Sequence, residues 1–327
     1  MPRRTSGPTR VEILGQVNGY VANTDFDWYR FLRDRSSSDE VNFWQPSSQA
    51  DFKAIPPGAP FFFRLKGPHN AIAGFGYFVR KLVLPAWEAW EAFGEANGVS
   101  SLADLTRRIA KYRRGEPHDP HGHQWIGCLI VSTPVFFAPD EWVRQPNGWS
   151  PNIVQGKRLD LASPDGRRIL DTCSAHALAQ ETIDAAAFEE ETGSRYGAPR
   201  LLRPRLGQST FRYAVRDAYG ACAVTTEHAY PVLEAAHIRP YSEGGRHEVA
   251  NGLLLRADLH RLFDRGYVTV TTEHRLQVSP RLRDEWQNGR QYYAMDGARL
   301  ALPRDPEHHP DPEALAFHNE TIFRDGF

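Results

Sequence analysis

The chain has 327 residues, enough for about two domains that each bury a core of their own. Hydrophobic residues make up 41% of it and charged residues 24%, a composition that excludes collagen-like, fibrous and disordered classes. The 39 Lys and Arg residues balance 40 Asp and Glu residues, for a net charge of −1. No global field therefore attracts nucleic acid, and any contact with phosphates must come from local charge.

The sequence carries no pattern of a membrane or secreted protein. Its longest apolar run, 125–138, is interrupted by Pro134 and is too short to cross a bilayer as a helix. No apolar segment follows Arg3 and Arg4, so we expect a cytoplasmic protein without a secretory signal. The three cysteines are widely spaced, which indicates reduced thiols rather than a disulfide framework.

Residues 11–161 are rich in aromatic side chains and alternate in the manner of a small sheet. Apolar, β-prone runs bounded by Gly and Pro clusters predict strands at 61–65, 71–79 and 126–131. Between them, apolar residues at helical spacing predict helices at 85–93 and 101–114. A mixed α+β domain over residues 1–161 follows.

The character of the sequence changes over 162–206. An acidic helical stretch at 175–191 precedes a run in which four arginines, Arg203 and Arg205 among them, meet no acid. Such a stripe suits a phosphate backbone, although a solvated linker explains the composition equally well. We expect a helical, Arg-rich linker over 162–206 and a second domain over 207–327.

The second domain contains a hairpin followed by a helix. Segment 233–238 is strand-like, 242–245 is a turn, and 252–255 is a second apolar run before a helical stretch. His260 and Asp264 are four residues apart on that stretch, so they share one helix face. Two ligands at this spacing can hold one divalent ion.

His237, Asn251 and His260 stand in the order and spacing of the HNH, or ββα-metal, nuclease motif, which this segment resembles. The resemblance implies that His237 is the general base, that Asn251 orients the loop and this histidine, and that His260 binds a metal, with Asp264 as a second ligand. A near-neutral imidazole accepts a proton from water at physiological pH. A divalent cation offsets charge that develops on the phosphate.

The resemblance extends over roughly 206–324 and is closest to a subgroup with AAHI on the first strand and HRLFDRG on the helix. Ala236 stands where many HNH nucleases place a metal ligand, so either Glu234 or water would complete the shell. Many relatives carry two CxxC pairs that hold a structural zinc. This chain keeps only Cys222 of these cysteines, and Thr225 stands in place of its partner. The resemblance therefore implies Mg²⁺, Mn²⁺ or Ni²⁺ at the catalytic centre and no structural zinc.

Two further arginines flank the motif. Arg239 follows the first strand and Arg261 lies on the helix. Guanidinium groups clamp phosphates in bidentate fashion, and solvated surface is the equal alternative.

Residues 11–161 resemble the EVE group of the PUA-like superfamily, in the aromatic segment 41–48 and in the strand pair 52–79. The group includes readers that flip a modified base out of DNA, and the resemblance implies a β-barrel. Flipping costs a few kcal/mol of unstacking, which stacking in an aromatic pocket offsets. The expected pocket residues are Trp44 first, then Phe43, Trp28, Tyr77 and Trp125. Taken singly, each of them is more often an ordinary core aromatic.

Together these features predict an α+β protein with an N-terminal PUA-like (EVE-type) β-barrel domain and a C-terminal ββα-metal HNH domain with flanking helices. The resemblances imply a type IV, modification-dependent restriction endonuclease that acts in phage defence on double-stranded DNA carrying 5-methyl- or 5-hydroxymethylcytosine. Because one HNH centre cuts one strand, we expect a homodimer. Two alternatives remain: a non-catalytic binder of modified DNA, which Ala236 raises, and a non-specific nuclease gated by a nucleotide or RNA.

Overall fold

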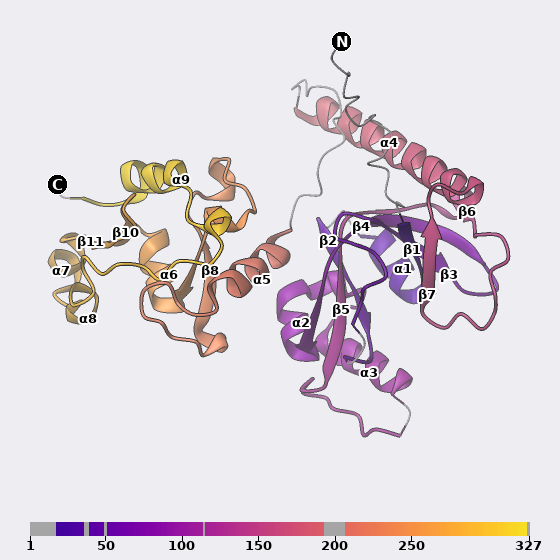
Figure 1. Cartoon of the computed structure of the whole chain (residues 1–327), viewed down its shortest axis with the longest axis horizontal. Helices are drawn as coiled ribbons and strands as arrows, with labels where there is room; N and C mark the ends of the chain where they lie inside the picture. Colours follow the sequence, from indigo (N-terminus) through magenta and orange to yellow (C-terminus); the bar gives the residue numbers. More distant parts are fainter. Residues whose placement is uncertain (1–17, 36–38, 49–50, 114, 193–206, 326–327) are drawn as a thin grey trace, which may run out of the picture. The chain divides into compact units, whose positions relative to one another are not determined.

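The computed structural model describes residues 18–35, 39–48, 51–113, 115–192 and 207–325, except the side chains of 180–192 (Figure 1). The chain divides into two compact units, Met1–Arg205 and Leu206–Phe327, and each is described by itself. Arg203 and Arg205 lie outside the described residues. In the part of the chain that is described, no helix is long and apolar enough to cross a membrane.

The N-terminal unit is built on one sheet, with strand order β2-β5-β4-β3-β1-β7 and with β6 paired to β4. The strands are β1 (Asn18–Thr24), β2 (Glu40–Gln45), β3 (Pro60–Leu65), β4 (Ala71–Pro85), β5 (Trp125–Phe136), β6 (Val143–Arg144) and β7 (Gly156–Asp160). β1 runs parallel to β3, and the other pairs are antiparallel. The three strands predicted from the sequence correspond to β3, β4 and β5.

Helices occupy the connections of this sheet. They are α1 (Phe26–Arg33), α2 (Ala86–Phe93), the 3-10 turn η1 (Gly94–Asn97), α3 (Leu102–Tyr112), the 3-10 turn η2 (Pro139–Glu141) and α4 (Pro164–Thr192). The side chain of Asp25 accepts a hydrogen bond from the backbone N–H of Asp27, and that of Ser101 from Asp104, so both α1 and α3 begin at an N-cap. The two helices predicted at 85–93 and 101–114 are α2 and α3.

The α+β class is confirmed, but the sheet is not a closed barrel. Among the described residues no pairing joins β2 to β7, the two ends of the strand order. β2 instead meets η1, where Asn42 Nδ2 donates to Asn97 Oδ1 at 2.9 Å and Trp44 Nε1 donates to the Asn97 carbonyl at 3.1 Å. Side chains of β2 thus bond a 3-10 turn, which periodicity along the strands does not reveal.

Apolar side chains pack on both faces of this sheet. Along β3, Phe61 and Phe63 enter one cluster with α1, while Phe62 enters the other, as the two-residue period of a strand requires. Ile169 and Cys173 on α4 are fully buried in the second cluster. The first turns of α4, which begin the expected linker, are therefore part of the N-terminal core.

The C-terminal unit contains the predicted hairpin and helix. Its elements are α5 (Gln208–Tyr219), η3 (Tyr230–Val232), β8 (Leu233–His237), η4 (Tyr241–Glu243), η5 (Val249–Asn251), β9 (Gly252–Arg256), α6 (Ala257–Asp264), β10 (Val268–Val270), β11 (Leu276–Val278), α7 (Arg281–Trp286), α8 (Arg290–Tyr293), η6 (Pro306–His308), α9 (Pro312–Phe317) and the π-helical turn η7 (His318–Ile322). β8 and β9 are antiparallel, with His237 opposite Gly252. The order β8-β9-α6 is a ββα unit (Figure 1).

Helix α5 packs closely against this hairpin. A Cβ atom at Gly252 would lie 2.5 Å from Val215 Cγ2 and 3.0 Å from the Phe211 ring. Helix α5 can therefore approach β9 this closely only because residue 252 is a glycine. Cys222 is fully buried beside the hairpin. The backbone N–H groups of Thr225 and Arg256 point at its Sγ, at 3.5 and 3.4 Å.

Candidate active site

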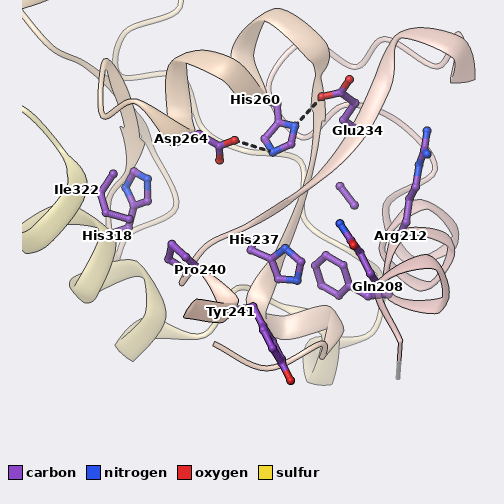
Figure 2. A pocket seen from close by; sticks show the side chains of 12 residues that line it. Gln208, Arg212, Glu234, His237, Pro240, Tyr241, His260, Asp264, His318 and Ile322 are labelled. Carbon is purple, nitrogen blue, oxygen red and sulfur yellow. Dashed lines mark hydrogen bonds and ion pairs between the residues drawn. The ribbon is translucent and has the colours of Figure 1, made fainter. Parts of the chain in front are cut away.

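A cavity of about 490 Å³ opens between α5, β8, α6 and the π-helical turn η7 (Figure 2). His237 reaches it from the end of β8, and His260 and Asp264 reach it from α6. The structure thus brings three of the four predicted HNH residues to one cavity. The fourth, Asn251, does not line it.

The imidazole of His260 lies between two carboxylates (Figure 2). Its Nδ1 is 2.7 Å from Glu234 Oε2 on β8, and its Nε2 is 3.3 Å from Asp264 Oδ2 one helical turn further along α6. If the neutral ring of His260 donates its Nδ1–H to Glu234, the lone pair of its Nε2 faces Asp264. Outer carboxylates commonly fix metal-binding histidines in this way.

His260 and Asp264 fit a divalent cation. Their facing donor atoms are 3.3 Å apart, close to the separation of about 3 Å between neighbouring donors of an octahedral shell with metal–oxygen bonds of about 2.1 Å. Across the described residues no group of three or more His, Cys, Asp or Glu side chains has a metal-binding arrangement. The other positions would be filled by water and phosphate oxygens, as Mg²⁺ sites often are.

His237 is half-buried and held on two sides. Its ring stacks on Phe211 of α5, with centroids 4.0 Å apart and planes 14° from parallel, and its Nε2 lies 3.0 Å from Nδ1 of His247. Burial and the neighbouring imidazoles of His247 and His260 lower the pKa of His237 to about 4. The ring is therefore neutral near pH 7 and has a lone pair with which to accept a proton.

Asn251 is buried and ties together the loop between β8 and β9. Its Oδ1 accepts from the Arg239 N–H at 2.9 Å, and its Nδ2 donates to the carbonyls of Arg239 at 3.0 Å and Arg246 at 2.9 Å. These bonds join the start of the loop to its middle, because Arg239 follows β8 closely and Arg246 precedes His247. Asn251 thus orders the loop rather than the cavity.

Arg239 and Arg261, two of the four arginines predicted to contact phosphate, do not line the cavity. The Arg239 side chain donates from Nε to the Glu243 carbonyl at 2.6 Å and covers the Phe317 ring at 4.5 Å. Arg261 is exposed on α6, away from the cavity-lining residues.

Arg212 lines the cavity instead (Figure 2). It belongs to α5, which the sequence analysis did not predict as a helix. The signal was present in the sequence, because Gln208, Phe211 and Arg212 stand at positions i, i+3 and i+4 and so share one face of α5. All three line the cavity.

His318 is a second cavity residue that the sequence analysis missed. It is fully buried and stacks on Phe263, with ring centroids 3.7 Å apart. Its Nε2 lies 3.1 Å from the Phe263 carbonyl and its Nδ1 lies 2.8 Å from Thr269 Oγ1. Burial lowers the pKa of His318 to about 4. The neutral ring anchors the carboxyl end of α6, where Asp264 stands.

A second cavity, of about 380 Å³, lies in the N-terminal unit. Three of the five predicted pocket residues, Trp28, Phe43 and Trp44, line it, and Trp125 does not. Trp28 is buried, while Phe43 and Trp44 are half-buried. Tyr77 does not line the cavity and packs with the second apolar cluster of the sheet, against Phe75.

Polar residues that the sequence analysis missed share this N-terminal cavity. Asp25 and Tyr112 line it, and the Tyr112 hydroxyl donates to Asp25 Oδ2 at 2.6 Å. Partial burial acts to raise the pKa of Asp25, but hydrogen bonds from Tyr112 and from the Asp27 N–H outweigh it and lower that pKa. Three cations also line the cavity: Lys66, Arg108 and Lys111.

His237 lies beside a His–carboxylate pair on a hairpin and helix. Residues 222–271 match the HNH endonuclease family, and this range contains β8, β9 and α6. The C-terminal unit therefore carries an HNH endonuclease domain, and because HNH nucleases use a divalent metal, the match supports a metal cofactor. No curated protein sequence matches the chain.

Solved structures with low similarity also align with the chain. An ASCH protein from Zymomonas mobilis has 9% sequence identity and a TM-score of 0.32, and the match covers 47% of this chain and 94% of that one. A modification-dependent restriction endonuclease, TagI, has 12% identity and a TM-score of 0.30, over 94% of this chain and 82% of that one.

Proposed function

We propose that the protein is a modification-dependent DNA endonuclease. Its N-terminal unit would bind a modified cytosine flipped out of the duplex, and its HNH domain would hydrolyse a phosphodiester bond. The observation that carries the proposal is that His237 and the His260–Asp264 pair line one cavity. Three of the aromatic residues expected to hold a base, Trp28, Phe43 and Trp44, line another.

In the proposed reaction, Nδ1 of His237 accepts a proton from a water molecule, because Nε2 is engaged with His247. The water oxygen attacks phosphorus in line, the bond to the 3′ oxygen breaks, and the leaving oxygen takes a proton from solvent water, which gives 5′-phosphate and 3′-hydroxyl ends. Arg212 donates hydrogen bonds to a non-bridging phosphate oxygen. His260 and Asp264 would hold a divalent ion, which when bound would supply positive charge that stabilises the leaving oxygen.

In the N-terminal cavity, the Trp44 and Tyr112 rings are 6.2 Å apart and inclined by 66°, so they form two walls at a steep angle. A flipped base would stack on one of them. The ionised Asp25 only accepts hydrogen bonds, which matches the exocyclic amino group of cytosine. Lys66, Arg108 and Lys111 would contact the flanking phosphates.

The test is a digest of otherwise identical DNA containing cytosine, 5-methylcytosine, 5-hydroxymethylcytosine or its glucosylated form, with Mg²⁺, Mn²⁺ or Ni²⁺. Cleavage restricted to one or more modified substrates supports the proposal. Equal cleavage of plain DNA would favour a non-specific nuclease. Tight binding of modified DNA without cleavage under any metal would make the protein a binder.

Trp44→Ala is expected to weaken the preference for modified DNA by about 5- to 150-fold, because a lost base–aromatic stack costs about 1 to 3 kcal/mol. Binding titrations with modified and plain duplexes measure this preference. Trp125→Ala is the matched control, since Trp125 is 55% exposed and does not line the cavity. An unchanged preference in Trp44→Ala would place the base elsewhere.

A double-strand break requires two HNH centres, so we propose that the protein cuts as a homodimer. Sedimentation of the protein on modified duplex should yield two chains per DNA under conditions that give double-strand breaks. A species with one chain that still breaks both strands without first releasing a nicked product contradicts this proposal.

A further inference from the structure

His237 is one of four aromatic rings that contact one another in a row, with Phe211 on one side and His247 and Tyr241 on the other. On one side it stacks on Phe211 at 4.0 Å. On the other it meets His247 edge-on, with centroids 5.0 Å apart and planes inclined by 64°, and Tyr241 stacks on His247 at 4.7 Å. His247 itself does not line the cavity, and its hydrogen-bonding contact with His237 connects it to the cavity.

The contact between the two histidines joins Nε2 of His237 to Nδ1 of His247 at 3.0 Å. Between two neutral imidazoles only one of these nitrogens carries the hydrogen. If His247 donates, the proton of neutral His237 is on Nδ1, and that nitrogen is no base. If His237 donates from Nε2, its Nδ1 keeps the lone pair that the reaction requires.

We propose that His247 is the positioning residue of the general base: its Nδ1 accepts the Nε2–H of His237 and so holds His237 in the tautomer with a basic Nδ1. This inference rests on the proposed role of His237. After His237 takes a proton from water, its Nε2–H still donates to His247, and the bond stabilises the imidazolium. Buried partners of catalytic imidazoles act in this way, and a wrong tautomer is costly.

The loop between β8 and β9 is built to hold His247 in place. Asn251 Nδ2 donates to the carbonyl of Arg246, the residue before His247, at 2.9 Å. The N–H of Ile238, the residue after His237, donates to the Asn251 carbonyl at 2.9 Å. The backbone on either side of the histidine pair is thus tied to the same asparagine, and the effect of Asn251 on His237 passes through this loop.

Two substitutions separate the hydrogen bond from the packing. His247→Phe keeps a ring between His237 and Tyr241 but removes the acceptor. His247→Asn loses the ring but places Oδ1, which is attached to Cγ like Nδ1, where it can accept. His228→Phe is the matched control, because His228 is exposed and does not line the cavity.

The first measurement is a long-range ¹H–¹⁵N spectrum of the full-length protein labelled in its histidine rings, with the His237 signals assigned through His237→Gln. We expect His237 to be protonated on Nε2 in the wild type and in His247→Asn, and to become a mixture of tautomers in His247→Phe. A wild-type ring protonated on Nδ1 would overturn the inference even if no variant folded.

The second measurement is the single-turnover rate on DNA that the wild type cleaves. The single-turnover rate of His247→Phe should be about 10- to 100-fold lower than that of the wild type, because removing the hydrogen-bond partner of a histidine in a site commonly has this effect. Its DNA affinity should be unchanged. His247→Asn should recover most of the loss. If His237→Ala is inactive while His247→Phe keeps the wild-type rate, His247 has no positioning role, and the assignment of His237 as the general base is retained. If His237→Ala is fully active, the proposed mechanism itself fails.

Discussion

His237→Ala is expected to lower the single-turnover rate of DNA cleavage by about 10²- to 10⁴-fold, the usual cost of losing a general base, while DNA affinity stays within a few fold of the wild type. The physical reason is that a neutral imidazole is lost from the cavity, where burial and the neighbouring histidines lower the pKa of His237 to about 4. The N-terminal cavity that we propose binds the base does not contain this residue.

Rapid-quench cleavage and equilibrium binding on the same duplex measure the two quantities. Thermal unfolding serves as a check, because the alanine also removes the stack on Phe211. His228→Ala is the control, since it removes an exposed imidazole. A His237→Ala protein that cleaves within threefold of the wild-type rate rules out this residue as the base.

His260→Ala is expected to abolish cleavage and to lower Mn²⁺ affinity by at least about tenfold. Two effects coincide: the cation loses its nitrogen ligand, and the carboxylates of Glu234 and Asp264 lose the imidazole that lies 2.7 and 3.3 Å from them. Mn²⁺ binding, followed by electron paramagnetic resonance, and the rise in melting temperature with Mn²⁺ report on the site without DNA.

Two milder variants assign the carboxylates. Asp264→Asn should weaken Mn²⁺ about as strongly as His260→Ala, because it alters the oxygen that faces Nε2. Glu234→Gln should lower the Mn²⁺ affinity about 10- to 100-fold, because the loss of a residue that hydrogen-bonds a metal ligand commonly has this effect. Asp284→Ala is the control, an exposed acid on α7. Unchanged Mn²⁺ affinity in both His260→Ala and Asp264→Asn would show that the metal binds outside this cavity.

The local part of the site could be predicted from the sequence. The spacing of His260 and Asp264 places them one helical turn apart, and their facing atoms are 3.3 Å apart. Two strand-like runs separated by a turn predicted the hairpin that carries His237. The aromatic segment 41–48, which contains Trp44, pointed to a cavity that the structure contains. In the first two cases the interacting residues are close along the chain or lie on one regular element.

Other parts of the site depend on contacts between distant segments. His247 meets His237 across a loop, Arg212 enters the cavity because α5 packs on Gly252, and Tyr77 turns to the face of the sheet opposite the cavity. Arg239 leaves the cavity because its guanidinium stacks on Phe317 of a helix far along the chain.

The sequence by itself determined the ββα order, the residue types of the HNH motif and the division into sheet-rich and nuclease parts, because periodicity and short spacings act within single elements. Only the tertiary structure decided which imidazole accompanies His237, which arginine lines the cavity beside it and that the sheet stays open. These outcomes follow from how side chains of separate elements pack, and packing is set by shape and hydrogen-bond geometry that no local pattern encodes.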